Sequence, residues 1–169
     1  MMSKPIDNKN LKADILKAFF QELDRELNTL VEAAFTAREV ATHEDSKAEN
    51  KYDTRGLEAS YLAGAQAKRA RELRETIDQL KKMPEKNYSA DDPIQSQALV
   101  TVEDEQGSEK HFLIVPKEGG AKVTVSQKTY FLITPDSPIG KKLLNRKLDD
   151  DFDFVLKGET VTYQITEIS

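Results

Sequence analysis

Acidic side chains crowd one short polar segment of the sequence, residues 41–56, which has the letters ATHEDSKAENKYDTRG. Five carboxylates lie in this segment or soon after it: Glu44, Asp45, Glu49, Asp53 and Glu58. Carboxylates this close repel one another until a cation neutralises them. The segment is therefore poised to bind a cation. The simpler interpretation is a solvated turn in which Asp45 or Ser46 caps the following helix.

Two long segments flank these acids, and both repeat apolar or small residues at helical spacing. In residues 11–41 the repeating positions are Ile15, Phe19, Leu23, Leu27, Leu30, Ala34, Ala37 and Ala41. In the second segment they are Tyr52, Gly56, Ala59, Ala63, Gln66, Ala70, Leu73, Ile77 and Leu80. Gaps of three and four residues are typical of a coiled-coil seam. Two such helices joined by a short polar segment predict an antiparallel hairpin, whose arms of roughly 30 residues are about 45 Å long.

The side chains of this seam become smaller toward the acidic segment. Leucine, isoleucine and phenylalanine occupy its far end, whereas Ala34 and Ala37 are expected to face Ala59 and Ala63 near the acids. Small residues let two helix axes approach, but their burial stabilises less, at about 25 cal/mol per Å² of apolar surface. The hairpin is therefore predicted to have a slender end, shaped to enter a narrow space.

The second half of the chain changes to a period of two. Residues 83–97 contain prolines, serines and aspartates and indicate a linker. Strands are predicted at residues 98–103, 111–116, 122–125, 129–134, 151–156 and 160–166. One short helix is expected after Ser137, a natural N-cap with Pro138 at the first helical position. The fold class is α+β, with one antiparallel sheet and a helix packed on it.

Composition limits the classes of function. The chain has 169 residues, no cysteine and a net charge of −5, which excludes thiolate chemistry and argues against broad binding to duplex nucleic acid. No apolar run approaches the roughly 20 residues that span a bilayer, and the first residues lack the apolar core of a signal peptide. We therefore expect a cytoplasmic protein with no membrane partner.

Two segments resemble a known family. Residues 137–168 contain SPIGKKLL followed by TYQITEI, which is similar to the end of the bacterial GreA/GreB transcript-cleavage factors. The acidic segment EDSKAENKYD resembles the tip of that family, GDLxENxxYD. A hairpin, a linker and then an FKBP-like sheet domain is also the family's order. The resemblance therefore covers essentially the whole chain.

The resemblance implies a partner and a division of the chain. Such factors dock the sheet domain on RNA polymerase and pass the hairpin down its secondary channel. It implies a coiled-coil hairpin over residues 1–82 with an acidic tip at about 42–53, a linker over 83–97, and an FKBP-like docking domain over 98–169. The expected fold is thus an N-terminal antiparallel coiled-coil hairpin plus a C-terminal FKBP-like antiparallel sheet with one short helix.

The resemblance also implies a mechanism. Two tip acids help to hold Mg²⁺ and a water at the polymerase's own active centre, where a second metal activates the water that hydrolyses backtracked RNA. The chain is then no enzyme by itself and needs no cofactor alone, because it shares Mg²⁺ with the polymerase. It meets the nascent RNA 3′ end indirectly, and no independent sequence-specific nucleic-acid binding is expected.

This sequence departs from the family's tip. The family's two acids are three residues apart, with a tyrosine seven residues after the first. Aligning Asp45 with the first acid places Tyr52 correctly but puts Ala48 at the second acid. Glu49 follows one residue later, and positions three and four residues on share a helix face. Glu44 replaces the family's glycine.

The resemblance then assigns roles at the tip and leaves alternatives open. Asp45 and Glu49 are the expected polymerase-assisting acids and, in the complex with polymerase, the magnesium ligands, with Glu44 as a substitute. Tyr52 and Arg55 are expected to contact RNA or polymerase near the tip. A factor that binds the same channel without cleavage, as a regulator or inhibitor, is favoured by Ala48. A third alternative is a prolyl isomerase or chaperone built on the FKBP-like sheet, although the aromatic residues here are expected in the strand core.

Overall fold

The computed structural model describes residues 8–43 and 55–169 of the chain. These form two compact units. One unit contains the start of the first helix, up to Phe19, together with residues from Pro84 to Ser169. The other contains residues 20–83. None of the described helices combines the length and the apolar character that crossing a membrane requires.

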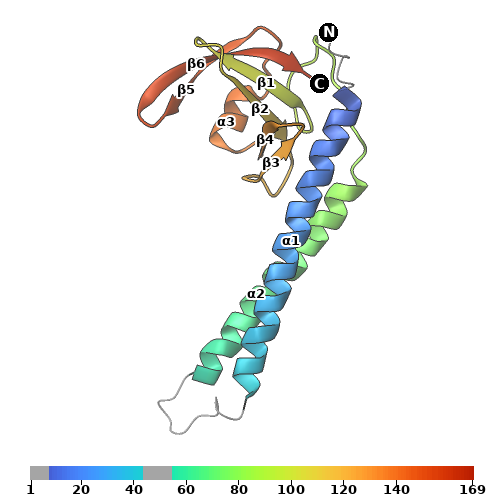
Figure 1. Ribbon diagram of the computed structural model, residues 1–169, viewed down its shortest axis with the longest axis vertical. Helices are drawn as coiled ribbons and strands as arrows, with labels where there is room; N and C mark the ends of the chain where they lie inside the picture. The colour runs from blue at the N-terminus through green and yellow to red at the C-terminus, as the bar shows by residue number, and fades with distance from the viewer. Residues whose placement is uncertain (1–7, 44–54) are drawn as a thin grey trace. The chain divides into compact units, whose positions relative to one another are not determined.

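The second unit is a helical hairpin. Residues 20–42 of α1 (Asn8–Thr42) and all of α2 (Arg55–Lys82) lie side by side and run in opposite directions (Figure 1). Arg69 Nη2 lies 3.2 Å from Glu26 Oε1, and Lys81 Nζ lies 3.8 Å from Asp24 Oδ2. The predicted antiparallel hairpin is therefore confirmed, and exposed ion pairs of this kind each add at most about 1 kcal/mol.

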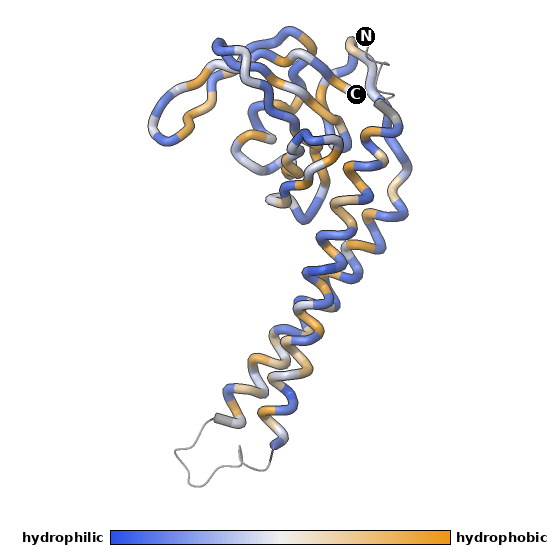
Figure 2. The backbone as a smooth tube through the Cα atoms, in the orientation of Figure 1, coloured by the Kyte–Doolittle hydropathy of each residue, from blue (hydrophilic) through white to orange (hydrophobic). Residues whose placement is uncertain are grey.

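The predicted seam is confirmed residue by residue. Every predicted seam residue among the described ones is buried or half-buried. The buried seam residues are Ile15, Phe19, Leu23, Ala37, Ala70, Leu73 and Ile77. Near the end of the hairpin, Ala34, Ala41, Gly56, Ala59 and Ala63 are only half-buried. Apolar and polar residues alternate along both arms (Figure 2). The side chains of the seam become smaller toward the end of the hairpin, as expected.

The first unit contains a six-stranded sheet. Its strands are β1 (Leu99–Asp104), β2 (Glu109–Ile114), β3 (Lys122–Val125), β4 (Lys128–Ile133), β5 (Asp151–Leu156) and β6 (Glu159–Ile168). Their spatial order is β3-β4-β2-β1-β6-β5. All neighbouring strands are antiparallel except β2 and β4, which are parallel. The sheet is therefore mixed where the sequence predicted a purely antiparallel one, because the β3–β4 hairpin adds to β2 through its second strand.

One face of the sheet packs against the short helix α3 (Pro138–Leu143). Ser137 caps this helix as predicted, since its Oγ accepts a hydrogen bond from Gly140 N at 3.1 Å and donates one to Thr134 O at 2.7 Å. Leu143 is fully buried in the core with strand residues such as Val100 and Ile165. The α+β class is thus confirmed.

Residues outside the strands also belong to this unit. Ile94 is fully buried in the core, and its backbone exchanges hydrogen bonds with Asn145 and Arg146 after α3. Near the start of α1, Lys12 Nζ donates hydrogen bonds to Lys86 O at 2.8 Å and Ser169 O at 3.2 Å. Burial lowers the pKa of Lys12 to about 8. The first turns of α1 are therefore tied to the two ends of the chain segment that contains the sheet.

Candidate functional site

The predicted magnesium acids lie outside the described residues. Glu44, Asp45, Glu49 and Tyr52 belong to residues 44–54, so their assignments stay predictions. Arg55 is the first residue of α2, and the structure describes only its backbone. The part of the candidate site that the structure does describe is the pair of helix ends on either side of this segment.

Large apolar side chains are exposed on both of these helix ends. Among the described residues, six of the eight exposed large apolar side chains lie within about 13 positions of residues 44–54. They are Val31, Phe35 and Val40 on α1 and Leu57, Tyr61 and Leu62 on α2. We call these six residues the distal apolar set. Phe35 is 62% exposed and Tyr61 is 72% exposed.

The distal apolar set surrounds the hairpin and does not form a single stripe. Successive residues of an α-helix are about 100° apart, so Val31 and Phe35 project within about 40° of each other. Val40 projects about 180° away from Val31 by the same geometry. On α2, Leu62 similarly projects about 140° away from Leu57. The end of the hairpin is therefore apolar on several sides.

This distribution indicates a binding surface. Exposed large apolar side chains that gather in one region of a protein, unlike ones scattered singly, mark sites of interaction. The large side chains of the set lie off the seam and are exposed, so they add little to the hairpin's stability. The arrangement suits a partner that encloses the end of the hairpin.

The seam pattern of the sequence does not reveal this set. A seam pattern assigns only the residues that face the neighbouring helix, and Phe35 and Tyr61 are not seam residues. The signal that identifies them is the contrast between large apolar residues off the seam and small residues on it. That contrast occurs only in the half of the hairpin next to the acidic segment.

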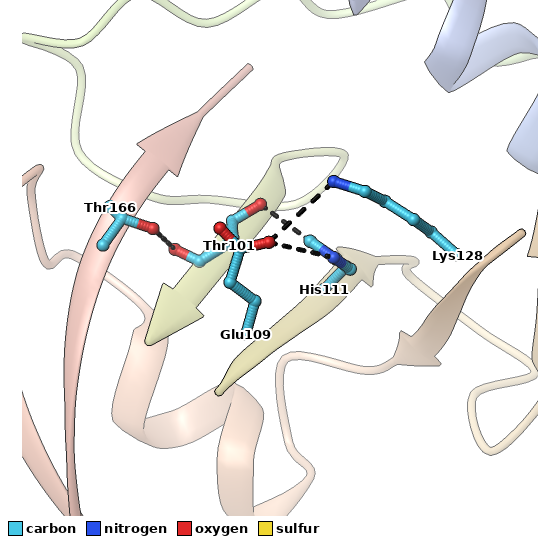
Figure 3. Close-up of polar contacts among 5 residues, drawn as sticks. All are labelled: Thr101, Glu109, His111, Lys128 and Thr166. Carbon is cyan, nitrogen blue, oxygen red and sulfur yellow. Dashed lines mark hydrogen bonds and ion pairs between the residues drawn. The ribbon is translucent and has the colours of Figure 1, made fainter. Parts of the chain in front are cut away.

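A second polar cluster lies in the sheet (Figure 3). His111 of β2 is buried, and its Nδ1 lies 3.0 Å from Thr101 Oγ1 on β1. Its Nε2 lies 3.8 Å from Glu109 Oε2, which is also 3.8 Å from Lys128 Nζ. Thr166 Oγ1 donates a hydrogen bond to Thr101 O at 3.3 Å. The cluster thus connects four strands of the sheet.

The electrostatics of His111 favour the neutral imidazole. Burial lowers the pKa of His111 below its ordinary value of 6.5, and the positive charge of Lys128 lowers it further, against the opposing effect of Glu109 and Glu167. A buried neutral histidine hydrogen-bonded to a threonine serves the packing of the strands. No group of three or more His, Cys, Asp or Glu side chains in the described part of the chain is placed to hold a metal ion.

The aromatic residues of the sheet fill its interior. Phe112, Phe152 and Tyr163 are buried in the core, and Phe131 and Phe154 pack against it. Tyr130 is also buried and lies beside His111, with ring centroids 5.3 Å apart. A prolyl isomerase needs aromatic side chains around a pocket for the proline ring. The described packing commits these side chains to the core, as the sequence predicted, and gives that alternative no support.

Comparisons with known proteins give one matching family model and several similar solved structures. A family model described as "Transcription elongation factor, GreA/GreB, C-term" matches residues 89–169. The GreA factor homolog 1 (Gfh1) of Thermus thermophilus is 21% identical, with a TM-score of 0.38, and the match covers 90% of this chain and 96% of that one. For Gfh1 of Thermus aquaticus the corresponding values are 20%, 0.39, 90% and 94%.

A third solved structure is the elongation factor GreA/GreB from Nitrosomonas europaea. It is 22% identical with a TM-score of 0.37, and the match covers 61% of this chain and 91% of that one. A comparison with curated proteins gives no match.

Proposed function

We propose that the chain is a transcription elongation factor of the GreA/GreB family, whose C-terminal model matches residues 89–169, and that it inserts its hairpin into the secondary channel of RNA polymerase. It is an accessory factor of the polymerase and not an enzyme in itself. The sheet domain docks on the polymerase surface, and the hairpin carries residues 44–54 toward the active centre.

The observation that supports insertion is the position of the distal apolar set. Large apolar side chains are exposed on several sides of the hairpin next to residues 44–54. A flat partner surface would cover one side only, whereas a channel covers all of them. Burying a phenylalanine or leucine side chain stabilises a complex by about 1.5–3 kcal/mol, so a few of these contacts suffice to hold the hairpin.

Transcript cleavage is the finer part of the proposal. Asp45 and Glu49 would hold a Mg²⁺ ion shared with the polymerase active centre, and Glu44 is a further acid beside them. Carboxylate oxygens are the ligands that this ion takes. The bound ion supplies activation of the water that attacks the RNA phosphodiester. Tyr52 and Arg55 would contact RNA or polymerase at the same end.

A second mode of action is a factor that occupies the channel without cleavage. The alanine at position 48 favours it, since the family resemblance places the second acid three residues after Asp45. In this mode the same apolar contacts hold the hairpin, and the tip blocks or resets the active centre. Both modes share the partner and the insertion, and they differ only in what the acids do.

Backtracked elongation complexes test the proposal directly. We expect the chain to shorten RNA from its 3′ end in the presence of Mg²⁺, and Asp45→Ala to abolish that shortening. Binding of the variant, measured with a fluorescently labelled chain, should stay within about twofold of the original because the apolar contacts are unchanged.

The outcomes separate the two modes. Fragments made equally by the chain and by Asp45→Ala contradict the role of this acid. Tight binding without any fragments supports the second mode. Failure of the labelled chain to bind the polymerase overturns the proposal as a whole.

A further inference from the structure

The sheet ends in two different edge strands. β3 has four residues and carries the exposed Lys122. Short edge strands and lysine side chains protect a sheet from pairing with other chains. β5 has six residues and lies at the opposite end, beyond β6 (Figure 1). Its Val155 is 63% exposed and offers no such protection.

The backbone of β5 alternates between β6 and the outer edge. The two strands are joined by the two-residue turn of Lys157 and Gly158, whose φ angles of 51° and 86° fit a tight hairpin. In such a hairpin Leu156 and every second residue before it exchange hydrogen bonds with the partner strand. The N–H and C=O groups of Asp153 and Val155 therefore face the outer edge.

A hydrogen bond from Arg146 independently supports the outward direction of these backbone groups. Its Nη1 donates a hydrogen bond of 2.8 Å to the carbonyl oxygen of Asp151, two residues before Asp153. Its guanidinium carbon lies 5.7 Å from the ring centroid of Phe152. Arg146 thus covers the first part of the edge. Residues 153–156 remain as the part of the described strand that is available to another chain.

The two faces of this edge differ in chemistry. Phe154 and Leu156 are half-buried and pack against the core, so their outer sides extend the core to the edge. On the opposite face the side chains of Asp151 and Asp153 are exposed beside Val155. An added strand would therefore need apolar residues on the core side and positive charges on the other side.

We propose that the outer edge of β5 binds an extended segment of another protein, in which basic and apolar residues alternate, as a seventh strand of the sheet. Backbone hydrogen bonds to Asp153 and Val155 provide affinity, and the alternating side chains provide specificity. A second copy of this chain is a poor occupant, because its own β5 would bring aspartates beside Asp151 and Asp153.

A short peptide of alternating lysine and valine probes this edge in the 169-residue chain. We expect the amide signals of Asp153 and Val155 in ¹⁵N NMR spectra to shift on titration, and their hydrogen exchange to slow at least about fivefold, because these N–H groups gain acceptors. A peptide of alternating glutamate and valine should bind at least about tenfold more weakly, because like charges then meet. Equal binding of the two peptides overturns the charge assignment.

Backbone methylation of the peptide tests strand addition without changing the protein. In an extended peptide the N–H groups of alternate residues face opposite sides. Methylating the nitrogens of all valines or of all lysines therefore blocks one side only. We expect one methylated peptide to lose binding and the other to keep it. Loss of binding by both, or by neither, overturns the strand geometry.

Two variants of Val155 complete the test. Val155→Pro removes the outward N–H and leaves the hydrogen bonds to β6 in place, so it should weaken peptide binding at least about fivefold. Val155→Thr keeps the N–H and should bind normally. Absence of any shift at Asp153 and Val155 with the unmodified peptide overturns the proposal. These experiments use no polymerase, so their outcome is independent of the proposed function.

Discussion

Phe35 and Tyr61 are exposed in the free chain, so their contribution to a complex is separable from their contribution to folding. We expect Phe35→Ser and Tyr61→Ser each to weaken binding to RNA polymerase at least about tenfold, because each removes roughly 1.5–3 kcal/mol of apolar burial in the complex. The stability of the free chain should change by no more than about 0.5 kcal/mol, as for other surface substitutions. Anisotropy of a labelled chain measures the affinity, and urea unfolding measures the stability.

Gln21→Ser is the matched control for these two variants. Gln21 is exposed on the same helix as Phe35, far from residues 44–54, and belongs to neither the seam nor the distal apolar set. It should bind like the original chain. If Phe35→Ser and Tyr61→Ser bind as Gln21→Ser does, the distal apolar set is not the surface that holds the polymerase.

His111 gives the sheet unit a pH dependence with a definite sign. Burial, with Lys128 beside it, lowers the pKa of His111 in the folded chain below 6.5, against the effect of Glu109 and Glu167. The unfolded chain therefore binds the proton more readily as the pH falls. The contribution of His111 to stability is complete above about pH 6.5 and is lost as the pH falls toward the pKa of the folded state. Urea midpoints between pH 8 and pH 5 should decrease accordingly.

His111→Gln isolates this contribution. Glutamine supplies a hydrogen-bonding amide for Thr101 and does not titrate. The variant should lose some stability at pH 8, and its midpoint should then decline less between pH 7 and pH 5 than that of the original chain. Parallel pH curves for the two proteins would assign the acid sensitivity to other groups.

Hairpin and strands were predictable because they follow local periodicity. The described seam residues between Ile15 and Leu80 are buried or half-buried, and the strands at 122–125 and 151–156 have the predicted bounds. The parallel pairing of β2 with β4 was not predicted, because strand order depends on which edges meet after the chain turns back. The burial of His111 was also beyond the pattern, since His111, Phe112 and Leu113 are all buried and show no alternation.

The candidate site was predictable only in part for a different reason. Its acids are visible in the sequence, but the contacts of Asp45 and Glu49 depend on a partner and on residues outside those described. The distal apolar set can be recognised only when the residues of the hairpin's seam are known. Phe35, for example, is identified as an exposed apolar residue only because it is not part of that seam. A binding surface whose contacts form only in a complex has a weaker sequence signal than a buried core.

Helix α3 depends on the absence of a side chain at its third residue. A Cβ atom at Gly140 would lie 2.1 Å from Thr134 O and 2.8 Å from Ser137 Oγ. Gly140→Ala must therefore displace the turn that caps the helix, and we expect it to destabilise the sheet unit by about 2–4 kcal/mol, combining overpacking with loss of the cap. Urea unfolding followed by circular dichroism measures the change.

Gly64 is the matched control within a helix. It is exposed in α2, and an added Cβ would meet no atom within 4 Å. Gly64→Ala should stabilise the hairpin by up to about 1 kcal/mol, because alanine is the better helix former. If both glycine variants change stability in the same direction, the close contacts at Gly140 do not explain its effect.

At the scale of the whole molecule, assays with RNA polymerase offer the sharpest separation of insertion from cleavage. Insertion is proposed to depend on the distal apolar set, and cleavage on where the carboxylates of residues 44–54 lie. These two properties reside in different residues, so one is expected to change without the other. Substitution at position 48 exploits this, because it adds an acid at the spacing of the family's tip without touching an exposed apolar residue.

Ala48→Glu places a carboxylate three residues after Asp45 and directly before Glu49. We expect it to raise the rate of RNA shortening in backtracked complexes at least about tenfold, since a better-placed oxygen ligand strengthens a weakly held Mg²⁺. The affinity for polymerase should stay within about twofold. Ala48→Gln adds the same side-chain bulk without a charge and should leave cleavage unchanged. Equal cleavage rates for the two variants would show that the missing acid at position 48 does not limit the rate. The rate would then be limited by how the end of the hairpin approaches the active centre.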